Sequence, residues 1–143
     1  MSDVIDVTGK TCNLKSGFRR RVCGETAVGL CQYCGRTFCR DHGVTQADAQ
    51  QVCSRKVCAA KLADLAVHLE YRAAAEARNE AGACGFEGCR APIANQCIRC
   101  QVFYCLNHAF GQEETLLDHN VRVRRIASLC RHCAARRSIW SRL

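Results

Sequence analysis

Residues 31–42 read CQYCGRTFCRDH, and 66 residues later, at 97–108, the chain reads CIRCQVFYCLNH. Both stretches fit one template, in which Cys-x-x-Cys, four residues and Cys-x-x-His follow one another. An aromatic residue, Phe38 or Tyr104, stands just before the third Cys. A Cys-x-x-Cys knuckle lets two side chains converge on one tetrahedral ion. The repeated template therefore predicts metal binding at two places in the chain.

Further Cys residues flank each copy of the template. The first half offers Cys12, Cys23, Cys31, Cys34, Cys39, His42, Cys53 and Cys58, and the second offers Cys84, Cys89, Cys97, Cys100, Cys105, His108, Cys130 and Cys133. Each set holds seven Cys and one His, and five positions recur at the same offset, which indicates an internal duplication. Since four ligands make one tetrahedral site, we predict about four Zn²⁺ per chain, with all 14 Cys used.

Composition favours zinc over disulfides as the element that holds the fold together. At 143 residues the chain makes one ordinary domain or two small ones, and small modules with few bulky apolar residues need such staples. The N-terminus MSDVIDVTGK lacks the pattern of a signal peptide, and no apolar stretch approaches the roughly 18 residues of a membrane span. We therefore expect a reducing compartment, the cytoplasm or another intracellular one, where Cys clusters bind metal.

The pairing of ligands into sites has two solutions. A cross-braced pairing joins the first and third pairs of each half, and the second and fourth; its four sites are Cys12, Cys23, Cys39 and His42; Cys31, Cys34, Cys53 and Cys58; Cys84, Cys89, Cys105 and His108; Cys97, Cys100, Cys130 and Cys133. The sequential alternative takes the first four ligands of each half together. We favour cross-bracing, because a hairpin of only four residues would present its two pairs to different ions. Phe38 and Tyr104 would then pack between the sites.

The template resembles that of the cross-brace, treble-clef-type zinc fingers, a superfamily that includes the B-box, HIT, AN-one and RING types. The resemblance covers residues 12–58 and 84–133 and implies a metal scaffold used for protein–protein interaction. RING domains usually carry their His earlier in the ligand order, whereas here it is sixth in both halves.

A helix is predicted between the two halves. Residues 59–83 are rich in Ala, Leu, Glu and Arg and free of Gly and Pro until Gly82. Leu62, Leu65 and Leu69 share one face at helical spacing. That face either packs on a zinc module or forms a seam for a partner chain. The predicted domains are a first two-zinc module at 1–58, a helical linker at 59–83 and a second two-zinc module at 84–143.

Other segments complete a small, zinc-stabilised α+β fold of short hairpins and helices. The sequence after Cys133, AARRSIWSRL, predicts a C-terminal helix. Residues 45–58 are predicted to be partly helical, because Thr45 and Asp48 have the spacing of a capping box. Residues 109–129 are predicted to form a long loop, with Glu113, Glu114 and Asp118 as a solvated acidic run.

Charge marks a second candidate surface. The formal charge of +8 falls to about +2 once the zinc-bound thiols are counted as thiolates, so the total charge says little about nucleic acid. The distribution says more, because the chain has seven Arg and no acid after His119. The candidate partner-binding residues are Leu62, Leu65, Leu69, Arg124, Arg125, Arg136, Arg137 and Trp140. The Arg residues either contact phosphates, with Trp140 stacking on a base, or offset the charge of the Cys clusters.

Three further His residues lie outside these ligand sets. His119 is the best substitute ligand, and His132, inside the last Cys pair, is an alternative to Cys130. His68 is predicted to be an ordinary surface residue of the linker helix.

The sequence favours a non-catalytic protein, because a catalytic zinc keeps an open position and no Cys is left over as a nucleophile. The first functional hypothesis is an adaptor that docks onto a larger protein assembly. The second is a nucleic-acid- or ribosome-associated protein that uses the Arg-rich C-terminus. The third is a RING-like ubiquitin-ligase adaptor. No small-molecule substrate and no membrane span are expected.

Overall fold

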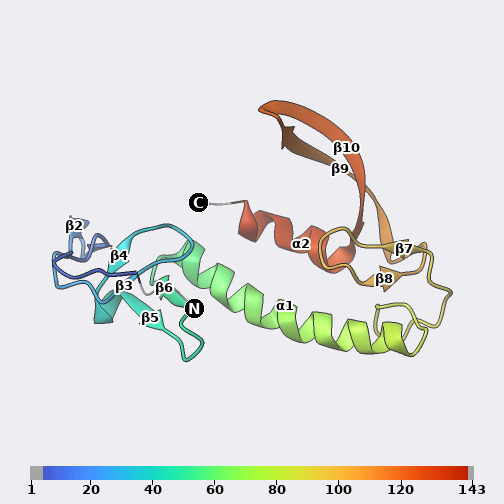
Figure 1. Ribbon diagram of the computed structural model, residues 1–143, viewed down its shortest axis with the longest axis horizontal. Coiled ribbons are helices and arrows are strands. Elements are labelled where there is room, and N and C mark those ends of the chain that lie inside the picture. The colour runs from blue at the N-terminus through green and yellow to red at the C-terminus, as the bar shows by residue number, and fades with distance from the viewer. Residues whose placement is uncertain (1–4, 142–143) are drawn as a thin grey trace. The chain divides into compact units, whose positions relative to one another are not determined.

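The computed structural model describes residues 5–141. Its chain divides into two compact units (Figure 1). Unit 1 comprises the residues up to Leu65 together with those from Ile139 onward, and unit 2 is Ala66–Ser138. The division falls inside one continuous helix, α1, so the predicted boundaries at residues 58 and 83 remain a prediction. Arg142, one of the C-terminal arginines, lies outside the described residues.

The described strands pair as antiparallel two-stranded hairpins. Unit 1 holds β1 (Lys15–Ser16) with β2 (Arg21–Val22), β3 (Gly29–Leu30) with β4 (Thr37–Phe38), and β5 (Gly43–Thr45) with β6 (Gln51–Cys53). A short 3-10 helix, η1 (Arg40–His42), precedes β5. Unit 2 holds β7 (Asn95–Gln96) with β8 (Phe103–Tyr104), and β9 (Ala109–Asp118) with β10 (Val121–Cys130). The helices are α1 (Lys56–Glu80) and α2 (Arg131–Trp140). A small α+β fold with four metal-binding clusters is what the structure shows.

The predicted linker helix is present but begins and ends three residues earlier than expected. It begins at Lys56, so that Cys58 lies in its first turn. It ends in a Schellman motif, in which the amide of Ala83 donates to the carbonyl of Arg78 at 3.0 Å and Gly82 adopts φ +80°. The Asn79 side chain then hydrogen-bonds the backbone of Phe103 in β8. The helix end is thereby tied to the core of unit 2.

Residues 45–58 were expected to be partly helical, and most of this prediction is wrong. The segment forms the turn of the β5–β6 hairpin, β6 itself and only the first residues of α1. Asp48 accepts hydrogen bonds from the amide and the side chain of Gln50 instead of capping a helix. A short polar side chain that hydrogen-bonds the backbone two residues further along stabilises a turn. The spacing of Thr45 and Asp48 therefore did not indicate a helix cap here.

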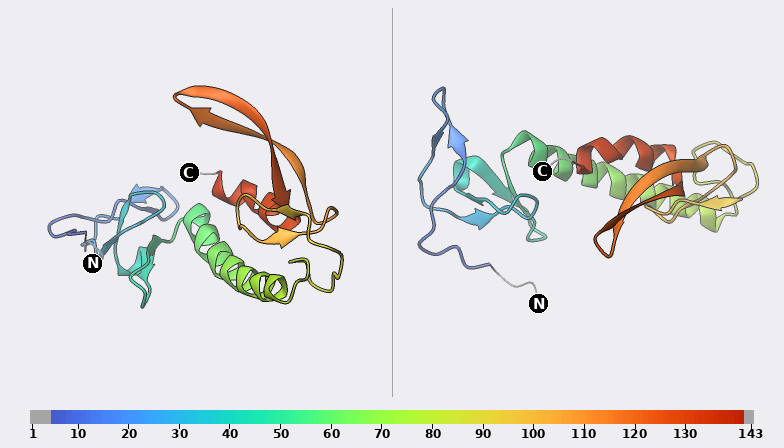
Figure 2. Two further views of the ribbon diagram at one scale, coloured as in Figure 1. Left: turned by 45° about the vertical axis from the view of Figure 1, so that its right-hand side comes forward. Right: turned by 90° about the horizontal axis from the view of Figure 1, so that it is seen from above.

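The predicted long loop at 109–129 is also wrong, because these residues form the β9–β10 hairpin (Figures 1 and 2). His119 and Asn120, its two turn residues, have φ values of 47° and 66°. Positive φ at both central positions is the type I′ arrangement that matches the twist of a hairpin. The alternation in VRVRRI and the Asp-His-Asn sequence were the available signals. The alternation of apolar and polar residues in this segment is interrupted by its consecutive charged residues.

Each unit has its own small core built around Cys residues and one aromatic ring. Phe38 in unit 1 and Tyr104 in unit 2 are the largest fully buried side chains, at 0% and 1% exposure. Each packs in a cluster that contains Cys residues of both halves of its template. A Cβ atom added at Gly29 or Gly43 would come within 2.5 Å of the Phe38 ring, so these glycines let the backbone approach it. Each ring is thus buried in a core that also holds Cys residues from both predicted sites of its unit.

Helix α1 presents a different face from the predicted Leu stripe. Leu62 packs partly buried against the core of unit 1, and Leu65 is half-buried. Leu69, however, is 54% exposed, while Ala75 is fully buried and Tyr71 packs against the core of unit 2. Neither Ala75 nor Tyr71 belongs to the predicted Leu stripe. Among the described residues, no helix combines the length and apolarity needed to span a membrane.

Candidate metal centres

Sixteen side chains come together in four groups, each with its ligand atoms within 4.8 Å of one another. Their members are Cys12, Cys23, Cys39 and His42; Cys31, Cys34, Cys53 and Cys58; Cys84, Cys89, Cys105 and His108; Cys97, Cys100, Cys130 and Cys133. We name them clusters 1 to 4 in that order. The grouping has the membership of the cross-braced alternative. All fourteen Cys are described, and all are free thiols that take part in a cluster.

The local fold explains why neighbouring pairs go to different clusters. In unit 1 the β3–β4 turn carries Cys31 and Cys34, and Cys39 and His42 follow β4 by way of η1. The amide of Cys31 donates to the carbonyl of Arg36, which closes the knuckle. The hairpin therefore separates the two pairs, and Cys53 at the end of β6 and Cys58 in the first turn of α1 complete cluster 2. In unit 2 the last two ligands come from the end of β10 and the first turn of α2.

Distances within the clusters are those of metal ligands and not of disulfides. The sulfur atoms of Cys23 and Cys39 are 3.9 Å apart, and those of Cys34 and Cys53 are 3.7 Å apart. A disulfide would bring them to about 2.05 Å. The His residues use Nδ1, which lies 3.3 Å from the Cys39 sulfur in cluster 1 and 3.1 Å from the Cys105 sulfur in cluster 3.

Backbone amides support the sulfur atoms. The amide of Cys105 donates to the Cys84 sulfur and that of Cys133 to the Cys130 sulfur, each at 3.3 Å. Such second-layer donors orient ligands and stabilise thiolates. In unit 1, burial raises the pKa of Cys31, but hydrogen bonds from backbone amides, including that of Cys53, outweigh it and lower the pKa to about 7. Burial raises the pKa of Cys58 to about 11.

Cluster 4 is the most enclosed, since all four of its Cys are buried. A hydrogen bond from Cys100 lowers the pKa of Cys97 well below its ordinary value, whereas hydrogen bonding to Cys100 raises the pKa of Cys133. The Tyr104 hydroxyl lies 3.8 Å from the Cys100 sulfur and 2.6 Å from the Tyr71 hydroxyl. Burial raises the pKa of Tyr71 to about 12. Tyr104 therefore links cluster 4 to α1, a contact that Phe38 has no hydroxyl to make.

The other His residues lie outside the clusters. His119 sits at the tip of the β9–β10 hairpin with a 95% exposed side chain that pairs with Asp118. His132 is not a member of cluster 4, and its Nε2 lies 3.0 Å from Nδ1 of His68. Its ring also stacks on Tyr71 at a centroid distance of 3.8 Å. His68 is therefore half-buried in a ring stack, and its prediction as an ordinary surface residue is wrong.

The predicted partner-binding residues lie on several elements. Arg124 and Arg125 are on β10 and not on a C-terminal helix, whereas Arg136 and Arg137 are on α2. The Trp140 indole donates to Asp64 at 2.6 Å and meets the Tyr33 ring edge-on at 5.6 Å. Its indole therefore already has partners within unit 1.

The prediction of a solvated acidic run is wrong for Glu114. It is 3% exposed and pairs with Arg99, which lies inside the Cys97–Cys100 knuckle, and with Arg125 at 3.5 Å. Although burial opposes ionisation, the two guanidinium groups lower the pKa of Glu114 below its ordinary value. Its neighbour Glu113 is 60% exposed and pairs with Arg124 at 2.7 Å. Glu114 thus fastens the base of the hairpin to cluster 4.

Glu114→Gln is expected to lower the free energy of unfolding by about 1 kcal/mol, because the buried carboxylate loses its charge-assisted bonds to two half-exposed Arg residues. Chemical denaturation of the metal-loaded protein at pH 7 measures this loss. Glu113→Gln is the matched control and should leave stability unchanged, since its ion pair is exposed. Because the Glu114 pKa is depressed, its contribution is present above the unfolded-state pKa and is lost as pH falls through the folded one. An equal effect of both variants would contradict the anchoring role.

Fold and clusters together define a small α+β protein whose Cys and His side chains are suited to bind four metal ions. Comparison with known protein families, with curated proteins and with solved structures finds no match for this chain.

Proposed function

We propose that this protein is a non-catalytic zinc-binding adaptor, in which four Zn²⁺ hold two tandem cross-braced modules and the modules present a binding surface to a partner protein. The observation that carries the proposal is the grouping of all fourteen Cys, with His42 and His108, into four sets of four. We place the protein in the cross-brace superfamily on the same ground. Free thiolate ligands of this kind require a reducing compartment such as the cytoplasm.

Geometry supports zinc as the metal. Ligands at about 2.3 Å (sulfur) and 2.0 Å (nitrogen) around a tetrahedral ion lie about 3.8 Å apart for two sulfurs and about 3.5 Å for sulfur and nitrogen. The closest sulfur pairs, at 3.7–3.9 Å, and the closest sulfur–nitrogen pairs, at 3.1–3.5 Å, follow this pattern. All ligand atoms of a cluster lie within 4.8 Å of one another. Thiolate and imidazole ligands are also those that zinc prefers in proteins.

The same grouping supports a structural and not a catalytic role. A catalytic zinc keeps one of its positions for water or substrate. Here each cluster supplies four protein ligands, which fill a tetrahedral ion. The chemistry of the protein is then recognition, and its surface decides its function.

The β9–β10 hairpin is the surface that favours a protein partner. Between residues 115 and 126, all of them described, none is buried. Ile126 and Leu117 are 79% and 75% exposed. Leu117 pairs with Arg122, and Arg122 and Ile126 lie on the same face of β10 because they are an even number of residues apart. Leu117 and Ile126 therefore lie on the same face of the ribbon. A two-stranded ribbon by itself is marginally stable and leaves both edges unpaired. A partner protein that covers this ribbon would bury the apolar side chains and satisfy the edges.

The arginines of the hairpin give weaker support to the alternative, nucleic-acid binding through the C-terminus. Arg124 and Arg125 each pair with a Glu of the facing strand, which offsets their charge. Arg137 donates to Gln112 at 3.3 Å.

The test is affinity purification of the tagged full-length protein from its native source, with proteins and nucleic acids both scored. We expect one or more proteins to be retained through a high-salt wash and to be lost with Leu117→Glu/Ile126→Glu. Leu69→Glu, which places the same charge at an apolar residue of α1 that is 54% exposed, is the control and should retain them. Zinc content must be the same for all three forms.

Other outcomes decide against this surface or this class. Loss of the partner with Leu69→Glu alone would move the surface to the predicted face of the linker helix. Recovery of nucleic acid without any retained protein would favour the second class. Discharge of a ubiquitin-loaded conjugating enzyme by the purified protein would instead support the RING-like ligase adaptor.

A further inference from the structure

A cavity of about 560 Å³ in unit 1 is lined mainly by basic side chains. Its basic members are Lys15, Arg20, Arg36, Arg55 and Lys56. Among the described residues that line it there is no Asp or Glu. The volume is within the range of about 300–1,000 Å³ that is usual for ligand sites. Like charges repel one another across a shared cavity, so this arrangement favours an anion that none of the lining residues supplies.

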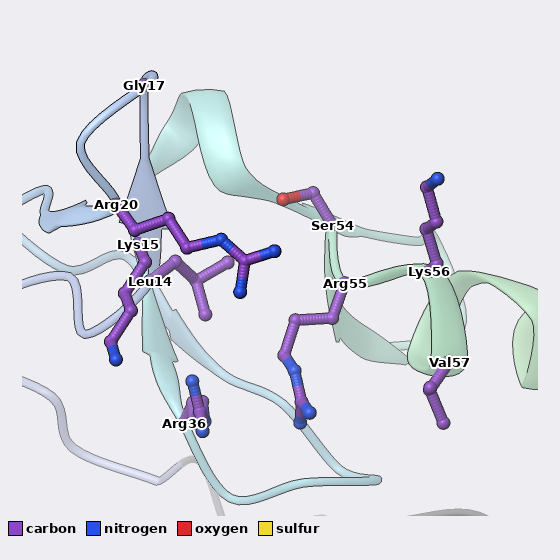
Figure 3. Close-up of a pocket in the computed structure, with 9 residues that line it drawn as sticks. All are labelled: Leu14, Lys15, Gly17, Arg20, Arg36, Ser54, Arg55, Lys56 and Val57. Atoms are coloured by element: carbon purple, nitrogen blue, oxygen red, sulfur yellow. The ribbon is translucent and has the colours of Figure 1, made fainter.

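Three separate segments bring these charges together. Lys15 and Arg20 come from the β1–β2 hairpin, Arg36 from the β3–β4 turn, and Arg55 and Lys56 from the start of α1. Figure 3 shows Arg20 and Arg55 extending their guanidinium groups from opposite sides toward the middle, with Arg36 below Arg20. The N-terminus of the 25-residue helix α1 lies at the same wall and adds a partial positive charge. Lys56 points away and contributes at longer range.

The metal clusters account for only part of this charge. The Cys34 thiol of cluster 2 raises the pKa of Arg55, because it favours the charged guanidinium. An ion of charge +2 held by four thiolates has a net charge of about −2, and Arg55 offsets part of it. Lys15, Arg20 and Arg36 remain on the other walls of the cavity. Their charge is therefore available to a ligand.

The loop that carries Arg20 also carries an exposed aromatic ring. Phe18 is fully exposed at the tip of the β1–β2 hairpin, between Gly17 and Arg19. Arg20 adopts the left-handed conformation with φ 48°, which is unfavourable for a residue other than glycine. A basic groove beside an exposed aromatic ring is the arrangement with which proteins bind single-stranded nucleic acid, the cations holding phosphates and the ring stacking on a base.

We propose that unit 1 binds single-stranded nucleic acid, with a backbone phosphate in the cavity formed by Lys15, Arg20 and Arg36 and a base on Phe18. This function is additional to docking on a protein partner. Its residues belong neither to the metal clusters nor to the β9–β10 hairpin. It also differs from the Arg-rich C-terminus as the place where phosphate is bound.

The experiment measures fluorescence anisotropy of a labelled 12-nucleotide oligouridylate with the full-length, zinc-loaded protein over a series of salt concentrations. Arg20→Glu/Arg36→Glu should weaken binding about tenfold or more and reduce the slope of log affinity against log salt by about 0.7, the contribution of one phosphate contact on a single strand. Phe18→Ala should weaken binding about fivefold with the slope unchanged, because stacking involves no counterion. Arg55 is left intact because of its contact with cluster 2.

The matched control is Arg122→Glu/Arg124→Glu, the same change of charge on the β9–β10 hairpin. It should bind the oligonucleotide within about twofold of the unaltered protein, allowing for the general loss of positive charge. Zinc content and the unfolding midpoint check that every variant is folded. Equal losses in the cavity and hairpin variants, or binding unchanged by the cavity variant, would overturn the proposal.

Two further probes separate the sources of phosphate. Sodium pyrophosphate should displace the oligonucleotide only at much higher concentration than unlabelled oligouridylate, and a 12-base-pair DNA duplex should bind more weakly than the single strand. Pyrophosphate that competes as well as the oligonucleotide would show that the cavity serves a small phosphate ligand, and the nucleic-acid proposal would be wrong. If the duplex bound as tightly as the single strand, stacking of an unpaired base on Phe18 would not contribute to binding.

Discussion

Cys97→Ala is expected to unfold unit 2 and to lower the zinc content from about four to about two ions per chain, because structural zinc supplies about 10–16 kcal/mol of apparent binding free energy in small zinc domains. That is as large as the whole stability of an ordinary domain, about 5–15 kcal/mol. Cys97 is fully buried in cluster 4, and the same core contains Cys84 and Cys105 of cluster 3. Loss of one cluster should therefore take the other with it.

Zinc content by elemental analysis and circular dichroism measure this effect. The matched control is Ser128→Ala, which removes a buried hydroxyl with no hydrogen-bond partner from the same unit and should leave zinc content and stability nearly unchanged. A strong metal chelator added to the unaltered protein should reproduce the loss. If Cys97→Ala kept four zinc ions, or if most Cys thiols of the native protein reacted with a thiol reagent, the metal assignment would be wrong.

Phe38→Ala is expected to cost about 3–5 kcal/mol, the usual penalty for truncating a buried aromatic residue. The ring is fully buried in contact with the core that includes Cys12, Cys31 and Cys53, residues of clusters 1 and 2. Gly29 and Gly43 approach its ring so closely that a Cβ at either would collide with it. Few other bulky side chains can move into the space, so the cavity should persist and the metal affinity of both clusters should fall.

Phe18→Ala provides the comparison, since it changes the same residue type in the same unit at a fully exposed position. It should leave the unfolding transition unchanged while weakening oligonucleotide binding. Denaturant titration of the two zinc-loaded variants checks both expectations. A similar loss of stability in the two would show that Phe38 does not hold the clusters together.

The features of the structure that depend on neighbouring residues could be predicted from the sequence. Spacing alone indicated the sixteen cluster residues, since a Cys-x-x-Cys or Cys-x-x-His pair is brought together by its own knuckle. The buried Phe38 and Tyr104 followed from the four-residue hairpin between the pairs. The existence of a long helix between the two halves of the chain followed from its composition. Each of these inferences depends on neighbours within a few residues.

The parts that sequence reading missed depend on partners far away in the chain. Glu114 looked solvated beside Glu113 and Asp118, and only the fold brings Arg99 to it from fifteen residues away. His68 looked like a surface residue until α2 placed His132 against it. The β9–β10 ribbon looked like a loop because its charged residues hid the alternation that pairing in register reveals.

The number, type and spacing of the Cys and His residues were thus enough to indicate a metal-held fold, because ligands in one knuckle converge through local geometry. Only the tertiary structure decided which side chains gather into charged or apolar surfaces. The basic cavity of unit 1 shows the reason: Lys15, Arg36 and Arg55 come from three segments that share no sequence pattern, and their charges act together only where the chain folds them around one space.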